Sequence, residues 1–90
     1  FGGEEFLVIL PYNDRHGTKL VANQLVEAVD KARIPHAKGI ENRVSISAGF
    51  AVLKATEVAQ DNFTSLIEDA DVSLFEAKES GRNQAKGYSL

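Results

Sequence analysis

The chain has 90 residues, 43% apolar and 26% charged, with a formal net charge of -3 at pH 7 and no Cys, Met or Trp. This charge and a pI near 5.3 disfavour a generic nucleic-acid or anionic-membrane binder, because such binding needs clustered Lys and Arg, so we expect neither partner for this segment. The lack of cysteine excludes a disulfide scaffold and a thiolate metal site, and no apolar stretch approaches the roughly 20 residues that cross a bilayer.

The chain starts at Phe1 rather than at an initiator Met, which leads us to expect a fragment with a cut edge. Residues 6–10 then form an unbroken apolar run that is closed by Pro11. A short run of β-forming apolar residues predicts a strand covered on both faces, and we expect it at the centre of a sheet.

An amphipathic helix is predicted over residues 14–34, with Asn13 or Asp14 as its N-cap and Pro35 as its stop. The apolar residues that recur at the helical period are Val21, Leu25, Ala28, Val29 and Ala32. Residues 35–43 contain Pro, Gly and Asn without a period, which predicts a loop or a short edge hairpin.

Larger and small residues alternate over residues 44–52, which predicts a strand. The larger residues are Val44, Ile46, Ala48, Phe50 and Val52, and the small ones are Ser45, Ser47, Gly49 and Ala51. We expect the larger face to lie on the core and the small face to be closely approached by another element.

A second helix follows the polar loop 54–61, with Asp61 or Asn62 as its cap and Ser80-Gly81 as its end. Its expected core positions are Phe63, Leu66, Ile67, Ala70, Leu74 and Ala77. The tail, residues 85–90, can add a last strand. This order of elements predicts an α/β or α+β fold in which helices cover a sheet.

The first candidate site is Gly2-Gly3-Glu4-Glu5, at the start of the apolar run. Paired glycines suit a hairpin turn and let a ligand come near the backbone, while carboxylates suit Mg²⁺ or Mn²⁺. Consecutive strand residues point to opposite faces, so we assign Glu4 to the site and Glu5 to a supporting position. The alternative is an ordinary turn followed by a solvated strand end.

The second candidate site is Lys78 with Arg82, four residues apart and therefore expected on one helix face. Two cations one turn apart can grip a polyphosphate, with Lys as a point charge and Arg as a planar fork. The alternative is that both cations only complement the negative end of the helix dipole.

Three segments resemble motifs of the bacterial diguanylate cyclases, which carry the GGDEF domain. Residues 2–6 are similar to the GG(D/E)EF signature, residues 44–51 to V-(S/T)-x-S-x-G-x-A, and residues 70–83 to AD-x-A-L-(Y/F)-x-A-K-x-x-G-R-N. Ser73 and Phe75 depart from the last pattern, where the family often has Ala and Tyr. The resemblance implies a palm-like nucleotide-cyclase fold, a mostly antiparallel central sheet flanked by helices, with the first half of the domain missing from the chain.

The resemblance also implies the chemistry. Two GTP molecules, one on each protomer of a homodimer, condense into cyclic di-GMP and pyrophosphate when each 3′-hydroxyl attacks the other α-phosphate. It implies that Glu4 binds the catalytic Mg²⁺ or Mn²⁺ and helps to deprotonate the hydroxyl. Gly2 and Gly3 shape the turn beside the nucleotide, and Lys78 and Arg82 bind the β- and γ-phosphates.

The chain also lacks parts of the family pattern. Nothing in it matches the D-x-(D/N)-x-F-K-x-x-N-D region, which supplies the other metal Asp and the guanine-reading residues, or the R-x-x-D product site. We therefore expect residues 1–90 to be the C-terminal portion of a cytoplasmic cyclase domain, inactive in isolation, whose parent can be membrane-tethered elsewhere. The alternatives are a non-catalytic nucleotide-sensing or dimerisation module, and a scaffold piece in which these residues are only structural.

Overall fold

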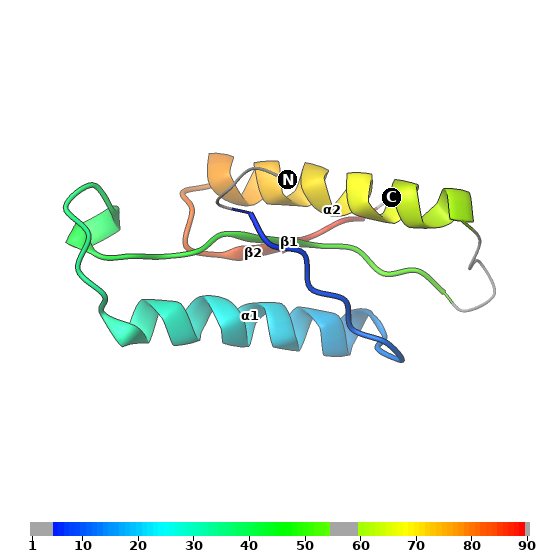
Figure 1. Cartoon of the computed structure of the whole chain (residues 1–90), viewed down its shortest axis with the longest axis horizontal. Coiled ribbons are helices and arrows are strands. Elements are labelled where there is room, and N and C mark those ends of the chain that lie inside the picture. Colours follow the sequence, from blue (N-terminus) through cyan, green and yellow to red (C-terminus); the bar gives the residue numbers. More distant parts are fainter. Residues whose placement is uncertain (1–4, 55–59, 90) are drawn as a thin grey trace.

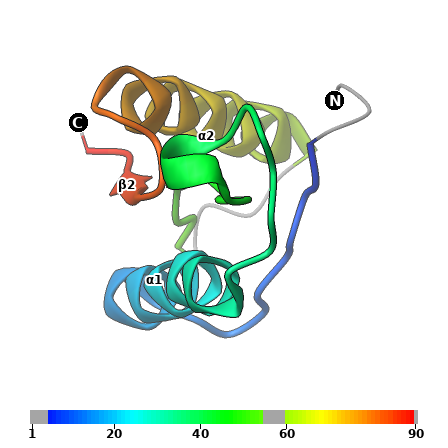
Figure 2. The same ribbon diagram turned by 90° about the vertical axis from the view of Figure 1, so that its left-hand side faces the viewer.

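The chain folds into a small α+β unit in which two helices lie on opposite sides of a two-stranded sheet (Figures 1 and 2). A computed structural model describes residues 5–54 and 60–89, without the side chains of residues 60 and 61. The elements follow along the chain as α1 (Arg15–Ala32), the 3-10 helix η1 (Ile40–Asn42), β1 (Ala48–Phe50), α2 (Gln60–Glu79) and β2 (Ala85–Gly87). No helix in these ranges is long and apolar enough to cross a membrane.

The predicted α+β fold class is confirmed, but the two strands of the described residues run parallel, whereas the resemblance implied a mostly antiparallel sheet. Ala48 pairs with Ala85 and Phe50 with Gly87. The whole of α2 joins β1 to β2, and a helical crossover of this kind returns the second strand in the same direction as the first. At Gly87 an added Cβ would lie 2.4 Å from the Phe50 ring, so the bare glycine backbone makes room for that ring.

The predicted strand over residues 6–10 does not form, and it is not covered on both faces. Residues 5–10 have no regular secondary structure, and Phe6 is 91% exposed and Ile9 75% exposed. Figure 2 shows this segment on the other side of β1 from β2. An apolar run favours extended backbone, but a strand also needs a hydrogen-bonded neighbour, and no segment in the described ranges pairs with this one.

Helix α1 is capped as predicted, although its buried face is displaced from the expected one. The Asp14 carboxylate accepts a hydrogen bond from the Gly17 amide at 2.8 Å, and Arg33 ends the helix in a left-handed conformation. Ala22 and Val26 are the buried residues, whereas Leu25 is 43% exposed. The apolar surface of α1 is wider than one stripe, and only one part of it packs on the sheet.

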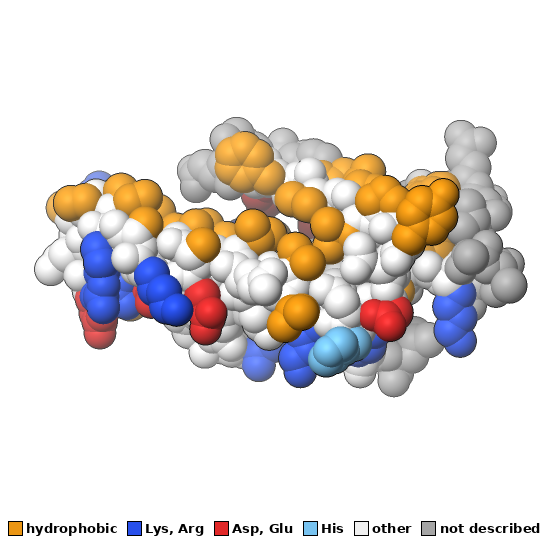
Figure 3. Space-filling view, turned by 90° about the horizontal axis from the view of Figure 1, so that it is seen from below, with side chains coloured by type: hydrophobic (Ala, Val, Ile, Leu, Met, Phe, Trp, Pro, Cys, Tyr) orange, Lys and Arg blue, Asp and Glu red, His pale blue; other side chains and the backbone are white. Residues whose placement is uncertain are grey.

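Figure 3, seen from the α1 side, shows apolar side chains spread across this face of the molecule. The large apolar residues that remain exposed in the first part of the chain include Leu7, Val8, Ile9, Leu20 and Leu25. The described core is correspondingly small, with Ala22, Val26, Phe50 and Ala77 as its buried apolar residues.

The predicted division of β1 into a core face and a small-residue face is confirmed, but the predicted length of the strand is wrong. Phe50 is 6% exposed, and on the opposite face an added Cβ at Gly49 would lie 2.2 Å from the Ala70 carbonyl oxygen and 2.2 Å from the Leu74 amide nitrogen. Helix α2 therefore packs directly on the backbone of the small-residue face. Residues 48–50 of β1 pair with residues 85–87 of β2, so the strand is shorter than the predicted 44–52.

Helix α2 begins at Gln60, so the predicted caps Asp61 and Asn62 lie inside it. Its end is as predicted, because the chain leaves the helix at Gly81, which has a φ of 119°. Ala77 is fully buried, whereas Phe63, expected in the core, is 49% exposed.

Two further expectations are confirmed. The predicted short hairpin in residues 35–43 is present as a single antiparallel bridge between Pro35 and Arg43, closed by the turn of η1. The predicted last strand is β2.

The contact at Gly49 generates a stability prediction. We expect Gly49→Val to lower the free energy of unfolding by at least about 2 kcal/mol, because the new side chain would collide with helix backbone that cannot move aside. Urea denaturation of the protein measures this. The matched control is Gly17→Ala, whose nearest contact is the end of the flexible Asn13 side chain, and we expect it to stay within about 1 kcal/mol of wild type. Unchanged stability of Gly49→Val would contradict the close packing.

Candidate functional site

The C-terminal end of α2 carries the two cations predicted to bind phosphates. Lys78 lies in the last helical turn, but Arg82 lies beyond the helix end at Glu79. The prediction that both stack on one helix face is therefore wrong. The chain turns left-handed over residues 81–83, with φ values of 119°, 63° and 49°, and the Arg82 amide donates to the Ala77 carbonyl oxygen at 2.9 Å. Glycine at position 81 permits this exit, and it takes Arg82 off the helix axis.

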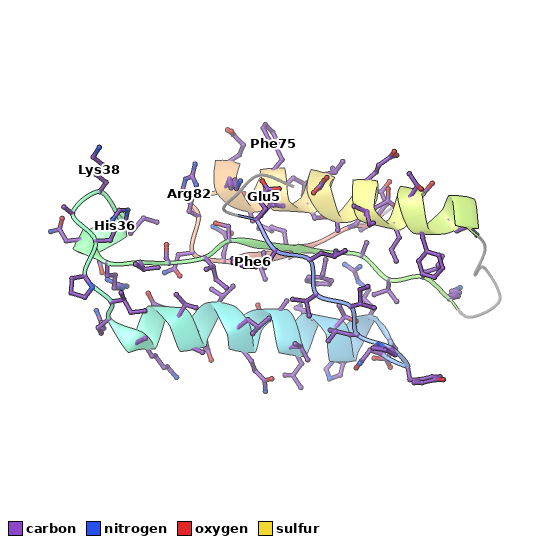
Figure 4. The ribbon with its side chains drawn as sticks, in the orientation of Figure 1. Glu5, Phe6, His36, Lys38, Phe75 and Arg82 are labelled. Atoms are coloured by element: carbon purple, nitrogen blue, oxygen red, sulfur yellow. The ribbon has the colours of Figure 1, made fainter. Side chains whose placement is uncertain are left out.

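The signature segment meets this end of α2 through Glu5. The Glu5 carboxylate lies 3.7 Å from the Lys78 ammonium, and both side chains are about one third exposed. Figure 4 shows Glu5 beside the C-terminal end of α2, near which Arg82 emerges. An ion pair this exposed contributes little stability, so its significance is that it places Glu5 beside Lys78.

Three predicted site residues, Gly2, Gly3 and Glu4, lie outside the described residues. Glu5, Lys78 and Arg82 are described: Glu5 lies near Lys78 in the last turn of α2, and Arg82 lies in the loop just beyond the helix. The role of Glu4 as metal ligand and the convergence of Glu4 with the cations therefore stay predictions.

A polar network lies next to this end of α2, and sequence reasoning missed it. Oδ1 of Asp30, on the last turn of α1, accepts hydrogen bonds from Arg43 Nε at 2.9 Å, Arg43 Nη2 at 2.7 Å and Asn83 Nδ2 at 3.0 Å. Arg43 also contacts the Glu41 carboxylate through Nη1. The network joins α1, the turn after it and the loop between α2 and β2.

The opposite charges in this network shift the pKa values of its side chains. The hydrogen bonds from Arg43, and then from Asn83, lower the pKa of the Asp30 carboxyl below its ordinary value. Arg43 lowers the pKa of Glu41 in the same way, and the two carboxylates raise the pKa of the Arg43 guanidinium. All three groups are therefore charged at neutral pH.

The sequence offered little to reveal this network, because Asp30 is separated by 13 residues from Arg43 and by 53 from Asn83. Asn83 is the last residue of the motif-like segment 70–83, and this was the one signal in the sequence that pointed to a member of the network.

A cavity of about 1090 Å³ in the described part of the chain lies elsewhere. It opens at the carboxyl ends of β1 and β2 and the start of α1, with Arg15, Lys54, Asp69 and Tyr88 among its lining residues. Arg15 has a structural role at this cavity, because its side chain donates a hydrogen bond to the Tyr88 carbonyl oxygen and lies over the Phe50 ring. Glu5, Lys78 and Arg82 do not line this cavity, so we do not assign the substrate to it.

Within residues 5–54 and 60–89, no group of three His, Asp or Glu side chains could hold a metal ion. The described residues alone do not fit a metal centre, and the role of Glu4 as a metal ligand stays a prediction.

Comparison with known proteins identifies the class. The model of the family "Diguanylate cyclase, GGDEF domain" matches residues 1–84, and the chain belongs to this family. No solved structure matches it.

The similar curated proteins carry the same description. Diguanylate cyclase VdcA of Vibrio cholerae is 33% identical over 84 residues, which is 93% of this chain and 24% of that protein. Diguanylate cyclase DosC of Escherichia coli is 29% identical over 86 residues, 96% of this chain and 18% of that protein. Diguanylate cyclase DgcS of Shewanella oneidensis is 38% identical over 82 residues, 91% of this chain and 25% of that protein. The chain thus spans a quarter or less of the length of these relatives.

The Asp30 network predicts a pH dependence of stability. Because the pKa of Asp30 is lowered on folding, its contribution is complete above the ordinary carboxyl pKa of about 4 and is lost as the pH falls through the lower folded value. We expect Asp30→Asn to lower the thermal unfolding midpoint at pH 7, with the difference from wild type shrinking below about pH 4. Glu27→Gln, an exposed carboxylate one turn earlier on α1, is the matched control. A difference that stays constant down to about pH 2 would contradict the assignment.

Proposed function

We propose that residues 1–90 are the C-terminal portion of a diguanylate cyclase domain that converts two GTP into cyclic di-GMP and pyrophosphate. The observation that carries this proposal is the Glu5–Lys78 ion pair, which brings one residue of the GGEEF signature to the end of α2, close to the loop that carries Arg82. Family membership supports the proposal, as does the description of the similar proteins as diguanylate cyclases.

In the proposed reaction each protomer of a homodimer holds one GTP. The 3′-hydroxyl oxygen of one GTP forms a bond to the α-phosphorus of the other, the bond from that phosphorus to the pyrophosphate oxygen breaks, and the hydroxyl proton passes to a base. We assign the base to Glu4, at the turn shaped by Gly2 and Gly3. The reaction then repeats in the opposite direction to close the ring.

Lys78 and Arg82 bind the β- and γ-phosphates. Negative charge accumulates on the departing pyrophosphate as the bond breaks, and phosphoryl transfer depends mainly on positioning and on stabilising that charge. Two cations on separate segments, one in a helix and one in a loop, can approach a triphosphate from different directions. Glu5 orients the Lys78 ammonium while the phosphates are absent.

The proposal includes Mg²⁺ or Mn²⁺ as cofactor, with Glu4 as one ligand. Such ions bind through one or two protein carboxylates together with substrate phosphates, and they supply positive charge beside the reacting phosphate. The region of the family that carries the second metal Asp and the guanine-reading residues has no match in this chain. Since GTP is the substrate, we place the domain in the cytoplasm.

The role of Glu4 is tested in the full-length protein. We expect Glu4→Gln to reduce cyclic di-GMP formation at least about 10²-fold, because a neutral amide neither accepts the proton nor holds the metal. Product is quantified by chromatography after incubation with GTP and Mg²⁺. The control is Glu68→Gln, an exposed carboxylate on α2, which we expect to be as active as wild type. Full activity of Glu4→Gln would refute the role of Glu4 as base and metal ligand, and GTP binding without any product in the wild type would favour a nucleotide sensor.

The isolated 90-residue chain provides a second test. We expect it to form no cyclic di-GMP, because the metal would lack a carboxylate and the reacting phosphate would be misplaced, and small misplacements alone can cost about 10²-fold. The measurement is the same product assay, run beside the full-length protein at equal concentration. Turnover at a comparable rate would show that these residues suffice for the reaction.

A further inference from the structure

The loop that carries Arg82 is held in a conformation that Arg82 does not favour. Arg82 has a φ of 63°, which costs a residue of this type about 1 to 2 kcal/mol, whereas Asn83, with a φ of 49°, is a residue type that tolerates this region. Conformations of this kind persist only where surrounding contacts impose them. The contacts on this loop therefore determine the position of the Arg82 backbone, and with it the point from which the Arg82 side chain extends.

Backbone contacts fix the two ends of the loop. The Arg82 amide donates to the Ala77 carbonyl oxygen at 2.9 Å on the α2 side, and the Gln84 carbonyl oxygen accepts from the Ala48 amide at 3.0 Å on the β1 side. The side chain of Gln84 donates hydrogen bonds within the loop, to the carbonyl oxygens of Ser80 and Arg82.

One side-chain hydrogen bond ties the middle of the loop to another element of the fold. Asn83 Nδ2 donates to Asp30 Oδ1 at 3.0 Å, and Asn83 immediately follows Arg82 in the chain. Asp30 is itself oriented, because the same oxygen accepts two bonds from Arg43, whose side chain is only 13% exposed.

The backbone of Arg43 is anchored as well, by the Pro35–Arg43 bridge and by the bond from the His36 amide to the Asn42 carbonyl oxygen. Figure 4 shows the turn that carries His36 and Lys38 at the same end of the molecule as Arg82.

We propose that Asn83 and Asp30 are positioning residues for GTP binding, which set the location of Arg82 by tying its loop to α1. The inference rests on the proposed function, because it needs Arg82 to bind phosphate. Neither Asn83 nor Asp30 contacts the substrate. Arg43 acts one step further away, by holding the Asp30 carboxylate in the direction of the loop.

The test uses the full-length protein and compares KM for GTP with kcat for cyclic di-GMP formation. The main variant is Asn83→Gly, which keeps a residue that tolerates positive φ and removes only the side-chain donor. We expect KM to rise about 5-fold and kcat to fall as well, because Arg82 contacts the phosphates in bound GTP and also as negative charge accumulates on the departing pyrophosphate. Asp30→Ala is expected to give the same change, and Glu27→Ala, one turn earlier on α1, no change.

A double-mutant cycle separates positioning from general destabilisation. In an Arg82→Ala background, Asn83→Gly should raise KM no further, because its effect acts through the Arg82 side chain. Thermal unfolding confirms that each variant is folded, and Asn83→Gly, which leaves the Asp30–Arg43 pair intact, serves if Asp30→Ala does not fold.

An unchanged KM for Asn83→Gly, or an equal increase in the Arg82→Ala background, overturns the inference alone. An Arg82→Ala variant with wild-type KM overturns the phosphate-binding role of Arg82, and this inference with it.

Discussion

The position of α2 on the backbone of β1 is the constraint on which the rest of the structure depends. At Gly49 the two elements approach so closely that even a Cβ would meet helix backbone at 2.2 Å. This contact fixes the depth and the rotation of the helix at its middle. It thereby places Lys78, which lies about one helical turn beyond Leu74, and the exit at Gly81 that leads to Arg82. A glycine in a strand thus determines where the cations of the candidate site stand.

Much of this fold could be predicted from local patterns, because each pattern reports a local preference. The 3.6-residue period and the Asp14 cap located α1, and the alternation of large and small residues predicted both faces of β1. Pairing between strands is not local, and the errors follow from that. Residues 6–10 have the composition of a strand but no neighbour in the described ranges, and the direction of the sheet depended on the α2 crossover rather than on any residue type.

The candidate site was predictable to the extent that motifs encode it. Glu5, which follows Glu4 in the signature, lies beside Lys78, while the convergence of Glu4 with the two cations stays a prediction. Spacing alone misplaced Arg82, because four residues correspond to one helical turn only while the helix continues, and Gly81 ends it. The Asp30–Arg43–Asn83 network had no local signal, since its members come from three segments and meet only in the folded chain.

The uncovered apolar segment after the signature affects how the protein behaves in solution. Residues 6–9 present large hydrophobic side chains on backbone whose amides and carbonyls lack a ladder partner in the described structure. Such a surface lowers colloidal stability and favours intermolecular β-sheet formation over the monomeric state. Preparations of the 90-residue chain are therefore best handled dilute, at a pH well above its pI of 5.3, where its net negative charge opposes precipitation.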